Sequence, residues 1–126
     1  MEKLTIARQT AARAQMTLIE VLKESPTPIV RDAAIQRFEY TFEAVWKLLK
    51  VFLLEHHGID IGSPKSSFRE ALKVAMLTPE QVEQALLMTQ DRNLTSHTYI
   101  EAIANTVYQR LGAHADLMQE IIDKTS

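Results

Sequence analysis

Cysteine is absent from the 126-residue chain, so disulfides, thiolate catalysis and cysteine-based zinc sites are excluded. Glycine and proline are scarce, with three and four residues, which favours helix over sheet. No apolar run exceeds four residues; we therefore expect no membrane span and no signal-peptide core, and we predict a cytoplasmic protein. The net charge of −2 gives no overall basic character, so DNA binding is not expected, whereas a local patch of Arg and Lys could still hold RNA.

What the sequence does contain is a strong helical period. Hydrophobic residues make up 46% of the chain and charged residues 24%, as expected of one globular domain spanning residues 1–126. Apolar positions recur every three or four residues in five segments, at residues 3–24, 29–57, 66–77, 79–91 and 99–124. The fold class that follows is all-α: an antiparallel up-and-down bundle of three long and two short helices.

Local sequence signals mark several helix ends. Gly58 follows two histidines at the end of the longest segment and is typical of a left-handed C-cap. Ser63 before Pro64 reads as an N-cap followed by the first helical residue. Thr78 with Gln81 has the spacing of a capping box, which predicts a helix start there.

The most polar stretch of the chain, residues 91–99, contains Arg92, His97 and Tyr99. On one continuous helix, Arg92 and His97 would point about 140° apart, because they are five positions apart. They could hardly share a ligand in that arrangement. A break in the helix between them would allow the two side chains to converge.

Residue types in this stretch favour such a break. Asn93 is a plausible left-handed cap for an incoming helix that ends near Arg92. Thr98 is a good N-cap for an outgoing helix, and with Glu101 it has capping-box spacing. We therefore predict a tight turn after Arg92 and a new helix from about Thr98.

The chemistry of this turn suits a phosphate ester. Arg92 offers a planar fork for phosphate, and the imidazole of His97 is a side chain that can accept or donate a proton in acid–base catalysis. The free amides of residues 98–101 would add a helix N-terminus that attracts anions. The trio lacks the carboxylates that would hold Mg²⁺, so we expect neither a metal nor a cofactor. The structural alternative is a salt bridge from Arg92 to Asp91 or Glu101 and a backbone hydrogen bond for His97.

The residues from Arg92 to His97 match the Arg-x4-His motif of the HEPN superfamily. With Tyr99 they match the longer Arg-x4-His-x-Tyr form of HEPN toxins that are paired with minimal nucleotidyltransferases. Residues 37–50 resemble the branch described as nucleotidyltransferase substrate-binding proteins, as do Ser63-Pro64, residues 68–71 and residues 91–93. The resemblance covers about residues 5–123.

This resemblance implies a helical-bundle homodimer whose motif lines a cleft between the protomers. It also implies a metal-independent endoribonuclease in which His97 deprotonates a ribose 2′-OH and Arg92 stabilises the charged phosphate, giving a 2′,3′-cyclic phosphate product. Asn93 and Ser96 would help to bind the substrate. The expected partner is a minimal nucleotidyltransferase antitoxin encoded nearby, which in some similar systems transfers AMP to the motif tyrosine, here Tyr99.

Two other functions remain open at this point. The chain could be a non-catalytic nucleotide- or substrate-binding subunit of a nucleotidyltransferase complex, which the net charge of −2 favours. It could also be a helical scaffold that needs none of the motif residues. Glu39 and Glu43 are candidates to line the cleft, but their position does not follow from the sequence.

Overall fold

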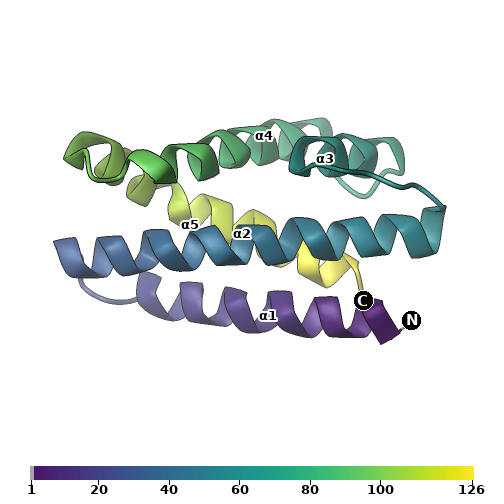
Figure 1. Cartoon of the computed structure of the whole chain (residues 1–126), viewed down its shortest axis with the longest axis horizontal. Helices are drawn as coiled ribbons and strands as arrows, with labels where there is room; N and C mark the ends of the chain where they lie inside the picture. Colours follow the sequence, from purple (N-terminus) through teal and green to yellow (C-terminus); the bar gives the residue numbers. More distant parts are fainter. Residues whose placement is uncertain (1) are drawn as a thin grey trace.

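The computed structural model describes residues 2–126, and throughout this range the chain is helical with short connections and no strand. Its elements, shown in Figure 1, are α1 (Glu2–Leu22), α2 (Pro28–His57), α3 (Pro64–Lys73), α4 (Pro79–Leu94), the 3-10 helix η1 (Thr95–His97) and α5 (Glu101–Lys124). The prediction of an all-α bundle is confirmed. Within residues 2–126, no helix is both long and apolar enough to cross a membrane.

Helix α2 lies at the centre of the bundle. It packs against α1, α3, α4 and α5, and its pairing with α1 is the most extensive of these contacts. In Figure 1, α1 runs antiparallel to α2 on one side, α3 and α4 lie on the other side, and α5 passes behind α2. The turn between α4 and α5 therefore lies at the end of the bundle where α2 begins.

The apolar stripe of α2 forms the middle of the core. Phe38 and Phe42 are buried, with ring centroids 6.1 Å apart, and Phe42 lies 6.1 Å from the buried ring of Phe68 in α3. Burying each such side chain stabilises the fold by roughly 1.5–3 kcal/mol relative to leaving it exposed. These aromatic contacts fix α3 against α2 and so set the direction in which α4 returns.

Three of the predicted caps, at Gly58, Ser63 and Thr78, are confirmed. Gly58 ends α2 in the left-handed region at φ 66°, where a residue without Cβ meets no steric penalty. The hydroxyl of Ser63 accepts from the amide of Ser66 at the start of α3. Thr78 and Gln81 form both hydrogen bonds of the predicted capping box at the start of α4.

The prediction for the third helix was right at its start, at Pro64, and wrong at its end, since α3 spans Pro64–Lys73 and does not continue to residue 77. Ala75 takes a left-handed conformation at φ 59°, and the amide of Met76 donates to the carbonyl of Ala71 at 2.9 Å. This is the hydrogen bond of a Schellman helix end, with alanine where glycine is usual, so no glycine marked it in the sequence. Leu72, in the last turn of α3, is exposed, whereas Met76 and Leu77 after the helix end are buried.

The predicted boundary between α4 and α5 was also wrong. Asn93 is not a left-handed cap, because α4 continues through it to Leu94 and then tightens into η1. Thr98 does not cap α5, because its hydroxyl donates to the carbonyl of Thr95 at 3.1 Å. The N-cap position of α5 is Ile100, at φ −87° and ψ 113°, and α5 begins at Glu101 without a side-chain cap.

Packing and side-chain hydrogen bonds explain why the helix continues. Leu94 packs against the hydrophobic core and Thr95 is buried, so ending α4 at Asn93 would expose both. The hydroxyl of Thr95 also donates to the carbonyl of Arg92 at 2.6 Å. The predicted break between Arg92 and His97 is therefore replaced by a change from α-helix to 3-10 helix at Thr95, and the interruption before α5 lies after His97.

Candidate functional site

Arg92 lies in the last turn of α4 and faces α2. Its side chain is 27% exposed; Nη1 is 3.4 Å from a carboxylate oxygen of Glu39, and Nε is 3.5 Å from one of Glu43. Nη1 also donates to the hydroxyl of Thr95 at 3.0 Å, while Nε makes no hydrogen bond. The guanidinium is thus held between two carboxylates of α2 and the first residue of η1.

The carboxylate of Glu43 is itself oriented by α2. The indole Nε1 of Trp46 donates to its second oxygen at 3.0 Å, one helical turn further along. A pocket of about 370 Å³ opens beside this group, lined by Gln36, Glu39, Tyr40, Glu43 and Arg92. Two carboxylates and one guanidinium give this pocket a net negative lining.

His97 and Tyr99 follow on the outside of the turn. Both are exposed, Tyr99 by 81%, and their rings meet edge to face with centroids 6.2 Å apart. Tyr99 borders a second pocket of about 320 Å³, lined by Asp32, Ile35, Gln36, Glu39, Thr98 and Tyr99. Because Gln36 and Glu39 border both pockets, α2 connects Arg92 to Tyr99 along one face.

The turn brings together only part of the predicted site. Arg92 and Tyr99 border adjoining pockets on α2, whereas His97 lines neither of them. Within residues 2–126 no hydrogen bond or ion pair joins Arg92 to His97. Asn93 and Ser96 are exposed on the same turn. One chain therefore presents the motif on a surface, without closing it into a cleft.

A buried charged cluster lies directly behind this surface, and the sequence did not reveal it. Asp91 is fully buried and accepts from Nη1 of Arg110 at 2.8 Å and from Nε2 of His114 at 2.7 Å, both on α5. The His114 ring stacks on Phe38 of α2 at 5.6 Å. The spacing of Arg110 and His114, four residues apart, places both on one face of α5 and was the available signal.

The protonation state of His114 follows from its surroundings. Burial lowers the pKa of this histidine below its ordinary value, and the hydrogen bond to Asp91 opposes the shift without cancelling it. Nδ1 of His114 is buried and has no hydrogen-bond partner, so a proton there would be unsatisfied. The neutral ring with its proton on Nε2, donated to Asp91, is the form that fits the site.

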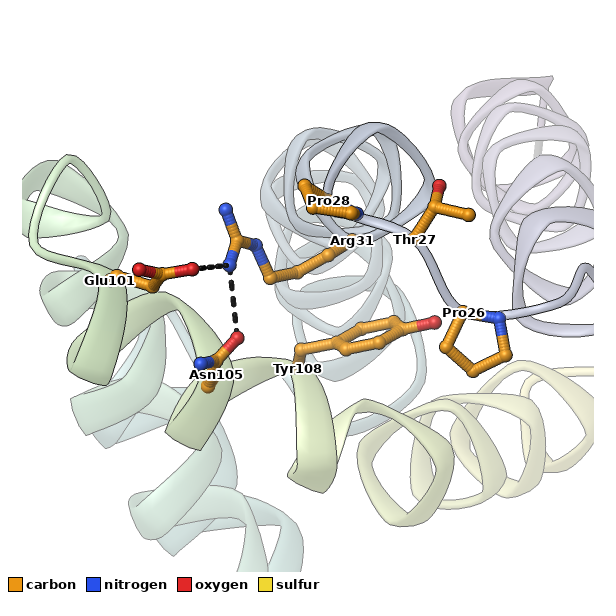
Figure 2. A pocket seen from close by; sticks show the side chains of 7 residues that line it. All are labelled: Pro26, Thr27, Pro28, Arg31, Glu101, Asn105 and Tyr108. Carbon is orange, nitrogen blue, oxygen red and sulfur yellow. Dashed lines mark hydrogen bonds and ion pairs between the residues drawn. The ribbon is translucent and has the colours of Figure 1, made fainter.

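A third contact fixes the start of α5 on the far side of the turn. Arg31, near the start of α2, donates to Oδ1 of Asn105 at 2.9 Å and pairs with Glu101 at 3.6 Å (Figure 2). A pocket of about 230 Å³ lies here, lined by Pro26, Thr27, Pro28, Arg31, Glu101, Asn105 and Tyr108. The alternative pairing of Arg92 with Asp91 or Glu101 was wrong, because those two carboxylates bind other cations.

The chain belongs to the family described as nucleotidyltransferase substrate binding protein like, whose model matches residues 4–126. This is the branch of the HEPN superfamily that the motif residues resemble. The match extends over all five helices and includes the turn that carries Arg92, His97 and Tyr99.

Two solved structures are similar to the chain. A crystal structure of a protein from Thermus thermophilus is 46% identical, covers 91% of this chain and 98% of its own, and has a TM-score of 0.88. A second crystal structure, described as a toxin-antitoxin with AMP-PNP, is 16% identical, covers 98% of this chain and 97% of its own, and has a TM-score of 0.78. At that identity the second likeness concerns the fold alone. No curated protein sequence matches the chain.

Proposed function

We propose that the protein is the toxin component of a toxin–antitoxin pair, acting as a metal-independent endoribonuclease that a partner minimal nucleotidyltransferase neutralises. The observation that carries the proposal is the segment around η1, residues 92–99, which presents an arginine, a histidine and an 81% exposed tyrosine on one short stretch of surface. Membership in a family described by nucleotidyltransferase substrate binding supports the partner. The fold shared with a structure described as a toxin-antitoxin supports the role.

The proposed reaction is an internal transfer within RNA. His97 accepts the proton of a ribose 2′-OH, and the oxygen attacks the adjacent phosphorus. The bond to the 5′-oxygen of the next nucleotide breaks, that oxygen takes up a proton, and a 2′,3′-cyclic phosphate is left. Arg92 stabilises the additional negative charge of the transition state, and Asn93 and Ser96 bind the neighbouring phosphate or sugar. In a homodimer, the same histidine of a second copy supplies the proton.

Arg92 can serve in this way only if its carboxylate neighbours give way. An incoming phosphate must displace or share the contacts at 3.4 and 3.5 Å to Glu39 and Glu43. Both acidic side chains are partly exposed, and exposed ion pairs of this kind typically contribute at most about 1 kcal/mol. Exchange of carboxylate for phosphate is therefore a small energetic step.

Tyr99 is the proposed point of control. Its exposed phenol can enter the active site of a partner, attack the α-phosphorus of ATP and release pyrophosphate, while the phenolic proton passes to a base or to solvent. The resulting AMP ester would place an anion and a bulky nucleoside beside His97, whose ring contacts that of Tyr99. RNA would then be excluded by charge and by volume.

The test is RNA cleavage by purified protein in the presence of a chelator. Wild type should cleave and leave cyclic phosphate ends, and His97→Ala should lose at least about a hundredfold in rate. His57→Ala is the matched control, because it removes an exposed histidine from the distant end of α2. Equal cleavage by wild type and His97→Ala would overturn the assignment of His97.

A second candidate function is a non-catalytic subunit that binds a nucleotide or substrate for a nucleotidyltransferase. The negative lining of the pocket beside Arg92 favours it, because a general ribonuclease gains from a positive field. Absence of cleavage by both wild type and His97→Ala, together with formation of a stable complex with the nucleotidyltransferase, would favour this function. AMP on Tyr99 can then be sought by mass spectrometry after incubation with that partner and ATP.

A further inference from the structure

The carboxylate of Asp91 has no access to solvent, yet it immediately precedes Arg92 in the same helical turn. Three observations define its surroundings: full burial, an ion pair from Arg110 at 2.8 Å, and a hydrogen bond from His114 at 2.7 Å. Among residues 2–126 these are its only side-chain partners, and both come from α5. Asp91 therefore attaches the last turn of α4 to a fixed position along α5.

Three connected contacts lead from this attachment to Arg92. His114 is held in place by stacking on Phe38 of α2, so its Nε2 has a fixed position relative to α2. Asp91, bonded to that nitrogen, fixes the rotation of α4 about its axis. Since Glu39 lies one residue after Phe38 on α2, the same rotation sets where the guanidinium of Arg92 stands relative to that carboxylate.

We propose that His114 and Asp91 are positioning residues for the Arg92 turn, so that a buried hydrogen bond between α5 and α4 sets the place of the guanidinium at the surface. This inference rests on the proposed ribonuclease function for its kinetic readout. It adds two residues, outside the Arg-x4-His-x-Tyr motif, on which the reaction depends. Neither touches RNA.

The variants separate positioning from general stability. His114→Leu removes the donor to Asp91, while His114→Gln can place an amide N–H near the former Nε2 and should rescue. Gln15→Leu is the matched control: Gln15 is buried and donates to the carbonyl of Ala115 at 2.8 Å, in the same turn of α5. It has no contact that leads to Arg92.

The kinetic experiment measures RNA cleavage at several substrate concentrations. His114→Leu should lower kcat at least about tenfold, because a displaced guanidinium no longer stabilises the charge of the transition state. His114→Gln should recover most of the rate, and Gln15→Leu should match wild type. Equal kcat in wild type and His114→Leu would overturn the proposal, as would equal losses in His114→Leu and Gln15→Leu.

A second measurement does not need catalysis. The Nε–H resonance of Arg92, identified by its loss in Arg92→Lys, should shift in His114→Leu and stay in place in His114→Gln and Gln15→Leu. If wild type cleaves no RNA, the proposed function fails, yet this resonance still decides the positioning role. Should His114→Leu not fold, Asp91→Asn serves in its place, and an unshifted resonance there overturns the inference.

Discussion

Asp91 and Arg92 are neighbours in sequence with opposite charges and opposite environments. Asp91 points into the bundle, where it has no solvent exposure and binds two partners on α5 at 2.8 and 2.7 Å. Arg92 points to the surface, where it is 27% exposed and stands 3.4 and 3.5 Å from two carboxylates on α2. The same helical turn thus carries one tightly bonded charge and one loosely bonded charge.

This difference separates a residue that fixes the structure of the turn from a residue that can bind a substrate. A buried ion pair that loses one partner leaves an uncompensated charge in a low dielectric, so its geometry is strongly enforced. A partly exposed ion pair is weak and can be exchanged for another anion. Asp91 is therefore suited to fix the turn, and Arg92 to bind and release a phosphate.

The largest expected effect comes from removing the buried charge. Asp91→Ala should lower the free energy of unfolding by about 1–3 kcal/mol, because it leaves the buried Nε2–H of His114 without an acceptor, whereas the partly exposed guanidinium of Arg110 can turn to water. Urea unfolding followed by circular dichroism measures this loss. A loss below about 1 kcal/mol would mean that the buried cluster is no more constrained than the surface pair.

The sequence could predict the local parts of this arrangement and not the contacts between helices. The caps at Gly58, Ser63 and Thr78 were predicted, since each depends on residues within one turn of the chain. Asn93 was misread as a helix end, because burial of the two residues after it outweighs its local preference. Here the packing of side chains in the core, and not the local residue types, determines where the helix ends.

The pairing partners of Arg92 and Asp91 likewise could not be predicted from local sequence. Pairing of Arg92 with Glu39 depends on how α4 lies against α2, and pairing of Asp91 with His114 depends on how α4 lies against α5. A helical period predicts which residues share a face of one helix. It does not predict which faces of two helices pack together, or how far one helix is shifted along the other. The motif could be found in the sequence and Glu39 and Glu43 were candidates to lie near it, whereas their pairing with Arg92 and the role of Asp91 and His114 could not be found there.

The next largest expected effect is a pH dependence of the free energy of unfolding that comes from the buried His114. The folded-state pKa of His114 is lowered by burial, so the unfolded chain takes up a proton first as the pH falls below about 6.5. Stability should be fully present above that pH and decrease below it, by at most about 1.4 kcal/mol per pH unit for one proton. Unfolding curves from pH 7.5 to 5.5 measure the slope.

The control for that slope is His114→Gln, which keeps a donor and does not titrate. Its stability should change less steeply than that of wild type over the same pH range. Parallel curves for the two proteins would show that protonation of His114 does not limit stability. Acid would then affect the stability contributed by the buried Asp91–His114 contact no more than that contributed by the surface contacts of Arg92.

A smaller effect is expected on RNA affinity when Arg92 loses its two carboxylate partners. The double variant Glu39→Gln, Glu43→Gln removes both negative charges beside Arg92 and should raise affinity for a non-cleavable 2′-O-methyl oligoribonucleotide by roughly five- to tenfold. The matched control, Glu24→Gln with Glu83→Gln, removes the same charge from exposed positions elsewhere. Fluorescence anisotropy at fixed salt compares them, and equal affinities would mean that net charge, not the local pair, governs binding.

The smallest expected effect is the stability change on removing the exposed charge itself. Arg92→Gln loses two long ion pairs and one hydrogen bond to Thr95, and exposed groups of this kind contribute at most about 1 kcal/mol. Urea unfolding should therefore place this variant within about 1 kcal/mol of wild type, a smaller loss than that in Asp91→Ala. A loss of comparable size would mean that Arg92 also supports the fold, and that its carboxylate contacts are too strong to be exchanged for a phosphate.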